Sequence, residues 1–237
     1  MLLLAACASP QPPEAAPILL FAGAGSSRND VAEIENILRA EHLRYATVDS
    51  RQFNNLSAEA LGAYQLLIVP GGNFIDIGNS LTPEACARVR DRVVHGGLRY
   101  LGICAGAILA GHNAGYNSFD IATGVHFPFY AASAQGLRKT VAPVTIAGET
   151  AGPIEQYWED GPQLTGWGTA AGKYPDGTPA IAEGPAGKGW MLLTGVHPEA
   201  PESWRRGMGF QQPVEVSRGL AVRLIHAAFT GQSILNR

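Results

Sequence analysis

Cys104 lies in a pattern that is typical of a catalytic nucleophile. Glycines stand two residues before it and two residues after it, in the stretch Gly-Ile-Cys-Ala-Gly at 102–106, between a predicted strand and a predicted helix. Such a turn is so tight that side chains at the flanking positions would collide. It also presents the sulfur at the positive end of a helix, which lowers the pKa of a thiol. The alternative is a buried structural cysteine in a turn rich in alanine and glycine.

A base and an acid follow a second apolar stretch. His197, Pro198 and Glu199 come directly after the predicted buried strand 190–196. A thiol nucleophile needs a base that takes its proton and a third group that orients the base. In an extended segment, side chains two residues apart point to the same side, so the Glu199 carboxylate can orient the His197 imidazole. His-x-Glu alone is a common pattern. Here it follows a core strand in a chain whose Cys104 lies in a tight strand-to-helix turn, a nucleophile elbow, and this combination points specifically to a catalytic base and its partner.

Further positions are candidates for contact with a substrate or an oxyanion. Gly71–Gly72 follows a predicted buried strand, and its backbone N–H groups, together with that of Ala105, would form an oxyanion hole. Asn73 follows these glycines and is a candidate substrate contact. Tyr157 and Trp158 precede a Gly-Pro turn, and they either line the pocket above the cysteine or pack against the strands of the second half.

The first half of the chain alternates short apolar stretches with helical patterns. This alternation predicts a parallel sheet with helices on both faces. Ligands bind to such sheets at the carboxyl ends of the strands, where both Gly71–Gly72 and Cys104 fall. The predicted strands are 17–22, 45–48, 64–69 and 100–103, and the predicted helices are 31–42, 56–61, 82–95 and 108–111.

The second half is rich in glycine, proline, threonine and aromatic residues between 115 and 190. Segments 141–146 and 178–182 are predicted strands joined by turns, and 216–230 is predicted as a closing helix. We therefore expect an α/β fold with a mostly parallel sheet, to which the second half adds antiparallel strands. Residues 18–237 are expected to form a single domain.

Composition excludes several classes of function. The 237 residues carry a net charge of −3 without a long basic run, which argues against a nucleic-acid partner. Three cysteines at wide spacings indicate neither a disulfide framework nor a zinc site, and the histidines have no ligand spacing. The prediction is therefore that the protein uses no metal and no cofactor.

The N-terminal segment 1–17 is predicted to lie outside the domain. Leu-Ala-Ala-Cys at 4–7 resembles the lipobox of bacterial lipoproteins, which implies lipid attachment to Cys7, a periplasmic or cell-envelope location, and a proline-rich tether in residues 8–17. Only six residues precede Cys7, fewer than a signal peptide's apolar stretch requires. Either the true start codon lies upstream, or the match arises by chance and the protein is cytoplasmic.

Three segments in chain order resemble the class I glutamine amidotransferase-like superfamily: 70–73, 102–106 and 197–199. With 157–162, the resemblance narrows to the domain at the N-terminus of eukaryotic biotin–protein ligases, which also occurs as a stand-alone bacterial protein. It spans nearly all of residues 18–230. The resemblance implies a flavodoxin-like three-layer sandwich and a catalytic triad. In that triad Cys104 is the nucleophile, His197 the base and Glu199 its orienting partner, while Gly72 and Ala105 bind the oxyanion.

Departures from the family pattern narrow the expected activity. Glutaminase domains usually carry glutamine four residues after the cysteine, where this chain has Ile108, and no ligase domain accompanies the fold. We expect a thiol-dependent hydrolase or amidase acting on the C–N bond of a small-molecule or peptide amide, not a biotin ligase. One alternative is a non-catalytic module that binds a small ligand. Another is a PfpI-like peptidase, in which histidine usually follows the cysteine directly, where this chain has Ala105.

Overall fold

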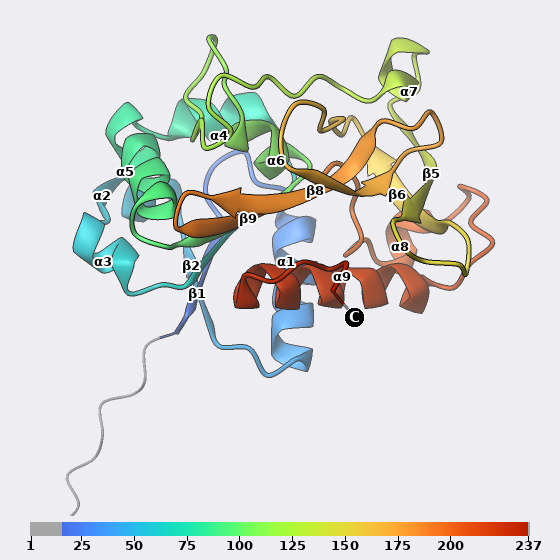
Figure 1. The fold of residues 1–237 in the computed structure, drawn as a ribbon, viewed down its shortest axis with the longest axis horizontal. Helices are drawn as coiled ribbons and strands as arrows, with labels where there is room; N and C mark the ends of the chain where they lie inside the picture. Colours follow the sequence, from blue (N-terminus) through green and yellow to red (C-terminus); the bar gives the residue numbers. More distant parts are fainter. Residues whose placement is uncertain (1–15, 237) are drawn as a thin grey trace, which may run out of the picture.

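A mixed sheet of nine strands forms the framework of the described residues, 16–236, in the computed structural model (Figure 1). The strands lie in the order β2-β1-β3-β4-β9-β8-β7-β5-β6. Pairs from β2 to β9 are parallel and pairs from β9 to β6 are antiparallel, so β9 joins the two halves. The strands are β1 Ile18–Phe21, β2 Tyr45–Val48, β3 Leu66–Val69, β4 Arg99–Ile103, β5 Lys139–Ile146, β6 Ile154–Glu159, β7 Thr169–Lys173, β8 Pro179–Ala186 and β9 Gly189–Thr194.

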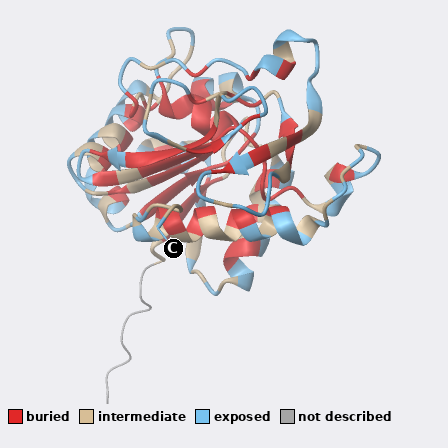
Figure 2. Ribbon diagram, turned by 45° about the vertical axis from the view of Figure 1, so that its right-hand side comes forward, coloured by how far each residue is buried: buried red, intermediate tan, exposed pale blue. Residues whose placement is uncertain are grey.

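Helices cover both faces of the parallel half, because alternate residues of its buried strands point to opposite sides. In β1, Ile18 and Leu20 pack with α1 and α9, whereas Leu19 and Phe21 pack with the helices of the other face. Figure 2 shows these strands as the buried centre of the molecule. The first face has α1 Arg28–Ala40 and α9 Val214–Thr230. The second has α2 Ser50–Asn55, α3 Ala58–Gly62, α4 Phe74–Ser80, α5 Pro83–Val94 and α6 Ala105–Ala110. The short helices α7 Ala131–Ala134 and α8 Glu202–Arg205 belong to the second half.

The predicted α/β architecture is confirmed, including the antiparallel strands that the second half adds. The strand predicted at 45–48 has the observed bounds, and the closing helix begins at Val214, two residues before its predicted start. Four short helices, α2, α4, α7 and α8, escape the sequence prediction. In α4, glycine and asparagine interrupt the helical pattern, and the helix depends on its Asn73 cap.

The predicted lipidation site, Cys7, lies outside the described residues, so lipid attachment remains a prediction. Within residues 16–236, no helix combines the length and the apolar character needed to cross a bilayer.

Thr82 begins α5 and provides a test of local stability. Its hydroxyl accepts a hydrogen bond from the Ala85 amide at 3.1 Å, and Pro83 occupies the first turn. We expect Thr82→Ala to lower the free energy of unfolding by about 1 kcal/mol, because the Ala85 amide then loses its acceptor. Thr82→Ser keeps the hydroxyl and should lose much less. Urea denaturation of both variants checks this, and equal losses would mean that the cap contributes nothing.

Candidate active site

A cleft of about 950 Å³ opens at the carboxyl ends of the parallel strands. The order β2-β1-β3-β4 reverses direction between β1 and β3, and ligands bind at such a switch point in open α/β sheets. Segments after β1, β3, β4 and β9 contribute Asp30, Gly72, Cys104 and His197 to its lining. The sheet therefore brings together the predicted nucleophile, base and oxyanion glycine.

Cys104 occupies the predicted tight turn between β4 and α6. Its backbone angles, φ 48° and ψ −103°, lie in a region that non-glycine residues rarely adopt, and its amide donates to the Thr194 carbonyl at 2.8 Å. Gly106 allows α6 to approach β3 closely, because a Cβ there would lie 2.0 Å from the Val69 carbonyl oxygen. The elbow is thus a strained turn held in place by the neighbouring strands.

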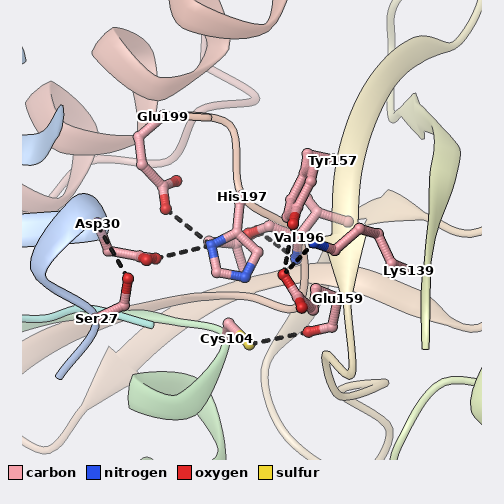
Figure 3. A network of polar contacts seen from close by, with 10 residues as sticks. Ser27, Asp30, Cys104, Lys139, Tyr157, Glu159, Val196, His197 and Glu199 are labelled. Carbon is pink, nitrogen blue, oxygen red and sulfur yellow. Dashed lines mark hydrogen bonds and ion pairs between the residues drawn. The ribbon is translucent and has the colours of Figure 1, made fainter. Parts of the chain in front are cut away.

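His197 follows β9 and is buried, and its amide donates to the Tyr157 carbonyl at 2.9 Å. Its Nδ1 lies 2.9 Å from Glu199 Oε1, as the sequence predicts, and also 2.9 Å from Asp30 Oδ1. Figure 3 shows both carboxylates at this nitrogen, with the other ring nitrogen on the side of Cys104. In this structure the Cys104 thiol donates to the Glu159 carbonyl, at 3.6 Å, and not to His197.

The charges in this cluster shift the pKa values of its members. Burial by itself would lower the pKa of His197, but the charges of Cys104, Asp30 and Glu199 outweigh it and raise the pKa well above its usual value. Burial raises the pKa of Glu199 to about 7, although His197 opposes the rise. The pKa of Asp30 is lowered despite burial, because His197 attracts its negative charge. The two carboxyl groups therefore differ in their tendency to ionise.

Among the described residues, no hydrogen bond uses the backbone N–H of either predicted oxyanion donor. Gly72 lies opposite Ser26 in a short antiparallel contact. The two hydrogen bonds of this contact run from the Ser27 amide to the Gly71 carbonyl and from the Asn73 amide to the Gly25 carbonyl, so neither uses the Gly72 amide. Ala105 begins α6, where the first N–H groups of a helix have no partner within it. These two N–H groups are therefore available to an oxyanion.

The predicted substrate contacts divide into two groups. Tyr157 lines the cleft, and its hydroxyl donates to the Glu159 carboxylate. Asn73 also lines the cleft, but its Oδ1 caps α4 by accepting from the Ile75 and Asp76 amides. Trp158 follows the second alternative and packs in the core instead of lining the cleft. Adjacent residues of β6 face opposite sides, so Trp158 is fully buried in the core, where its Nε1 donates to the Gly161 carbonyl.

Asp30 is the site residue that sequence reasoning misses. It lies in the first turn of α1, 3% exposed, and the only local signal is that Ser27 caps a helix just after β1. The ligand-type atoms of Asp30, His197 and Glu199 lie within 4.8 Å of one another, so the described residues contain a cluster that could hold a metal ion. Both carboxylates, however, already contact the same imidazole nitrogen.

The walls of the cleft are also absent from the predicted site. One wall is apolar, with Phe74 packed on Phe129 at 5.9 Å between ring centroids and Ile75 beside it. Ile75 and Phe129 are 45% and 44% exposed, so this wall presents apolar surface to the cleft. The other wall carries the ion pairs Arg138–Asp160 and Lys139–Glu159, so its charges are balanced.

The raised pKa of Glu199 predicts a pH dependence of stability. Its carboxyl group titrates near pH 4.5 in the unfolded chain and near 7 in the folded protein, so between these values the folded state binds more protons. Stability should therefore fall as pH rises from 4.5 to 7, by on the order of 2 kcal/mol relative to Glu199→Gln. Denaturation of both proteins across this range measures the difference. Parallel curves would contradict the raised pKa.

The strand order and the elbow after β4 define the class of protein: it has the glutamine amidotransferase class I-like fold. A match to a sequence family gives a more specific assignment than the fold does. Residues 16–138, just over half of the chain, match the family described as "Biotin-protein ligase, N terminal", and the chain belongs to this family. No curated protein sequence matches the chain.

Solved structures support the fold. A crystal structure of a glutamine amidotransferase is 21% identical with a TM-score of 0.55, covering 77% of this chain and 90% of that one. A glutamine amidotransferase from Thermotoga maritima is 12% identical with a TM-score of 0.56, covering 90% and 97%. An exo-β-1,4-mannosidase from Opitutaceae bacterium strain TAV5 is 13% identical with a TM-score of 0.55, covering 88% of this chain but 36% of that one. At these identities the likeness shows the fold alone.

Proposed function

We propose that this protein is a thiol-dependent hydrolase that cleaves a C–N bond, with Cys104 as nucleophile, His197 as base and Glu199 holding the imidazole ring. The observation that carries the proposal is the strained elbow cysteine, in a cleft it shares with a buried histidine whose Nδ1 is fixed by carboxylates. A core cysteine has no need of such backbone strain, whereas strain of this kind clusters at active sites.

The proposed reaction uses two steps. The Cys104 thiol gives its proton to His197 Nε2, and the thiolate attacks the amide carbonyl carbon. The Gly72 and Ala105 amides stabilise the resulting oxyanion. His197 then protonates the leaving nitrogen, the C–N bond breaks and a thioester remains on Cys104. Water, deprotonated by His197, attacks the thioester and releases the acid, and the thiol regains its proton.

The cleft also favours a class of substrate. Its apolar wall would hold an apolar group beside the scissile bond, whereas the opposite wall of paired charges would make polar contacts without selecting for net charge. Ile108, in the place where glutaminases usually carry glutamine, favours a substrate other than free glutamine. We therefore expect turnover in a panel of amides whose acyl group is apolar.

Comparison of two cysteines tests thiol activation without knowledge of the substrate. Cys86 is buried in α5, and burial raises the pKa of its thiol to about 12. We expect a small electrophile such as iodoacetamide to label Cys104 at least about tenfold faster than Cys86 at pH 7. Mass spectrometry of the digested protein measures both rates in one sample. Labelling of Cys104 no faster than that of Cys86 would contradict the proposal.

A second function, binding of a small ligand without turnover, is favoured by one observation. The Cys104 thiol donates to the Glu159 carbonyl, so the contact between nucleophile and base is not formed in this structure. A panel of amides separates the two functions when thermal stability and hydrolysis are measured together, with Cys104→Ser as control. Compounds that stabilise the protein without being cleaved would support the binding module.

A further inference from the structure

Two carboxyl groups compete for one nitrogen in the active site. Asp30 and Glu199 each place an oxygen 2.9 Å from Nδ1 of His197, and Figure 3 shows both contacts at this one nitrogen. All three side chains are at least nine-tenths buried. If Nε2 serves as the base, Nδ1 carries a single proton, and two buried negative charges around it would repel each other. One carboxyl group must therefore carry the negative charge more readily than the other.

Asp30 has surroundings that stabilise a negative charge. It lies in the first turn of α1, a helix of 13 residues, where the helix dipole favours a negative charge. Ser27 caps this helix, and its hydroxyl accepts a hydrogen bond from the Asp30 amide at 3.3 Å, which fixes the start of the helix beside the cleft. The proximity of His197 adds an attractive charge.

Glu199 has surroundings that favour the neutral acid. Its Oε2 is buried and has no hydrogen-bond partner among the described residues. Asp30 Oδ1 also lacks a well-aligned hydrogen bond, but it lies 2.9 Å from Nδ1 of His197. Glu199 borders a cavity of about 10 Å³ whose seven other lining residues are apolar, among them Ile34, Leu101 and Leu224. A cavity so small and apolar would not hold a water molecule that could solvate a carboxylate. An ionised Glu199 would therefore remain largely unsolvated at Oε2.

The contact between Asp30 and His197 depends on a residue without a side chain. A Cβ at Gly71 would lie 2.4 Å from Asp30 Oδ1 and 2.5 Å from His197 Cε1. Only glycine at this position lets the loop after β3 pass so close to both groups. The fold thus leaves space for this pair, in addition to the pair that His197 forms with Glu199.

We propose that Asp30 carries the negative charge that positions His197 and stabilises its imidazolium form, and that Glu199 is a neutral partner that only holds the ring. The inference rests on the proposed function, because it assigns a role in activating Cys104. The proton moves from Cys104 Sγ to His197 Nε2, while the Nδ1 proton stays between the ring and Asp30. The other titratable groups near the ring are Cys104 itself and Tyr157, whose ring centroid lies 5.7 Å away. Lys139 and Glu159 pair with each other on the charged wall of the cleft.

The rate at which iodoacetamide alkylates Cys104, measured between pH 5 and 9, tests this role. We expect Asp30→Asn to slow alkylation at pH 6.5 by about tenfold or more and to move its onset at least about one pH unit upward. Glu199→Gln mimics the neutral acid and should slow it only a few-fold. Asp30→Glu restores the charge and should recover part of the rate. Asp76→Asn removes an acid from the first turn of α4 and should leave the profile unchanged.

The outcomes separate this inference from the proposed function. A larger loss in Glu199→Gln than in Asp30→Asn would overturn the inference, and so would fast alkylation in Asp30→Asn with an unshifted onset. Slow alkylation of Cys104 in the wild type would overturn the proposed function as well. If Asp30→Asn does not fold, carbon-13 NMR of the wild-type carboxyl groups gives the answer. Asp30 should stay ionised from pH 5 to 8 while Glu199 titrates, and the reverse order would sink the proposal.

Discussion

Substitution of His197 by glutamine should slow the alkylation of Cys104 at neutral pH by about 100-fold or more. Among residues 16–236 the imidazole is the one buried base beside the sulfur, and removal of a general base typically costs between about 100-fold and 10,000-fold. Glutamine has a similar volume, so the side chain can still pack beside Tyr157 and Trp204, which lie around the imidazole ring.

The control for this prediction is a histidine remote from the cleft. His226 lies in α9 and contacts Glu41, so His226→Gln removes an imidazole and a carboxylate contact without touching the site. It should leave the alkylation rate of Cys104 unchanged. An equal rate in wild type and His197→Gln would show that the thiol does not depend on the histidine, and the proposed base would have to be abandoned.

A large effect on stability is expected at Gly106. In Gly106→Ala the new methyl group would lie 2.0 Å from the Val69 carbonyl oxygen, where neither backbone can move without disrupting the elbow or β3. We expect the free energy of unfolding to fall by about 3 kcal/mol or more, the upper range for overpacking in a rigid core.

The same substitution in another helix supplies the matched control. Gly219 lies in α9 with open space around its Cβ position, so Gly219→Ala should stabilise the protein by about 0.5–1 kcal/mol through improved helix propensity. The same glycine-to-alanine change is therefore expected to lower the free energy of unfolding at Gly106 and to raise it at Gly219, and urea denaturation of both variants measures this. If Gly106→Ala left the free energy of unfolding unchanged, the elbow would be able to move away from β3, and the prediction would be wrong.

The site residues that could be predicted from the sequence are those that directly follow an apolar strand. Cys104 and His197 each come directly after a buried strand, so strand order alone places them at one edge of the sheet, and the geometry agrees. Asp30 could not be found in this way. Acidic residues also occupy the first turns of α3, α4 and α5, where Glu59, Asp76 and Glu84 lie, so the local pattern does not distinguish a site residue from an ordinary helix start.

The adjacent aromatic residues in β6 show a second limit of sequence reasoning. The alternation of a strand shows that Tyr157 and Trp158 point to opposite faces, but both are aromatic, and either could line a cleft. Tertiary packing decides between them, because the core encloses the Trp158 ring and the Gly161 carbonyl accepts a hydrogen bond from its Nε1. Gly161 lies in the turn after β6, and the hydrophobic periodicity of the sequence does not show where that turn places its carbonyl group.

The central place of β9 has a consequence for the order in which reactivity arises during synthesis. β4 and the elbow leave the ribosome long before β9, which pairs with β4 and carries His197 to the cleft. The nascent chain therefore exposes Cys104 without its base, and the thiol meets its base only once the last strand has inserted. The segment that matches the family, residues 16–138, also lacks β9. A fragment cut at that boundary would keep the sulfur and lose the means to activate it.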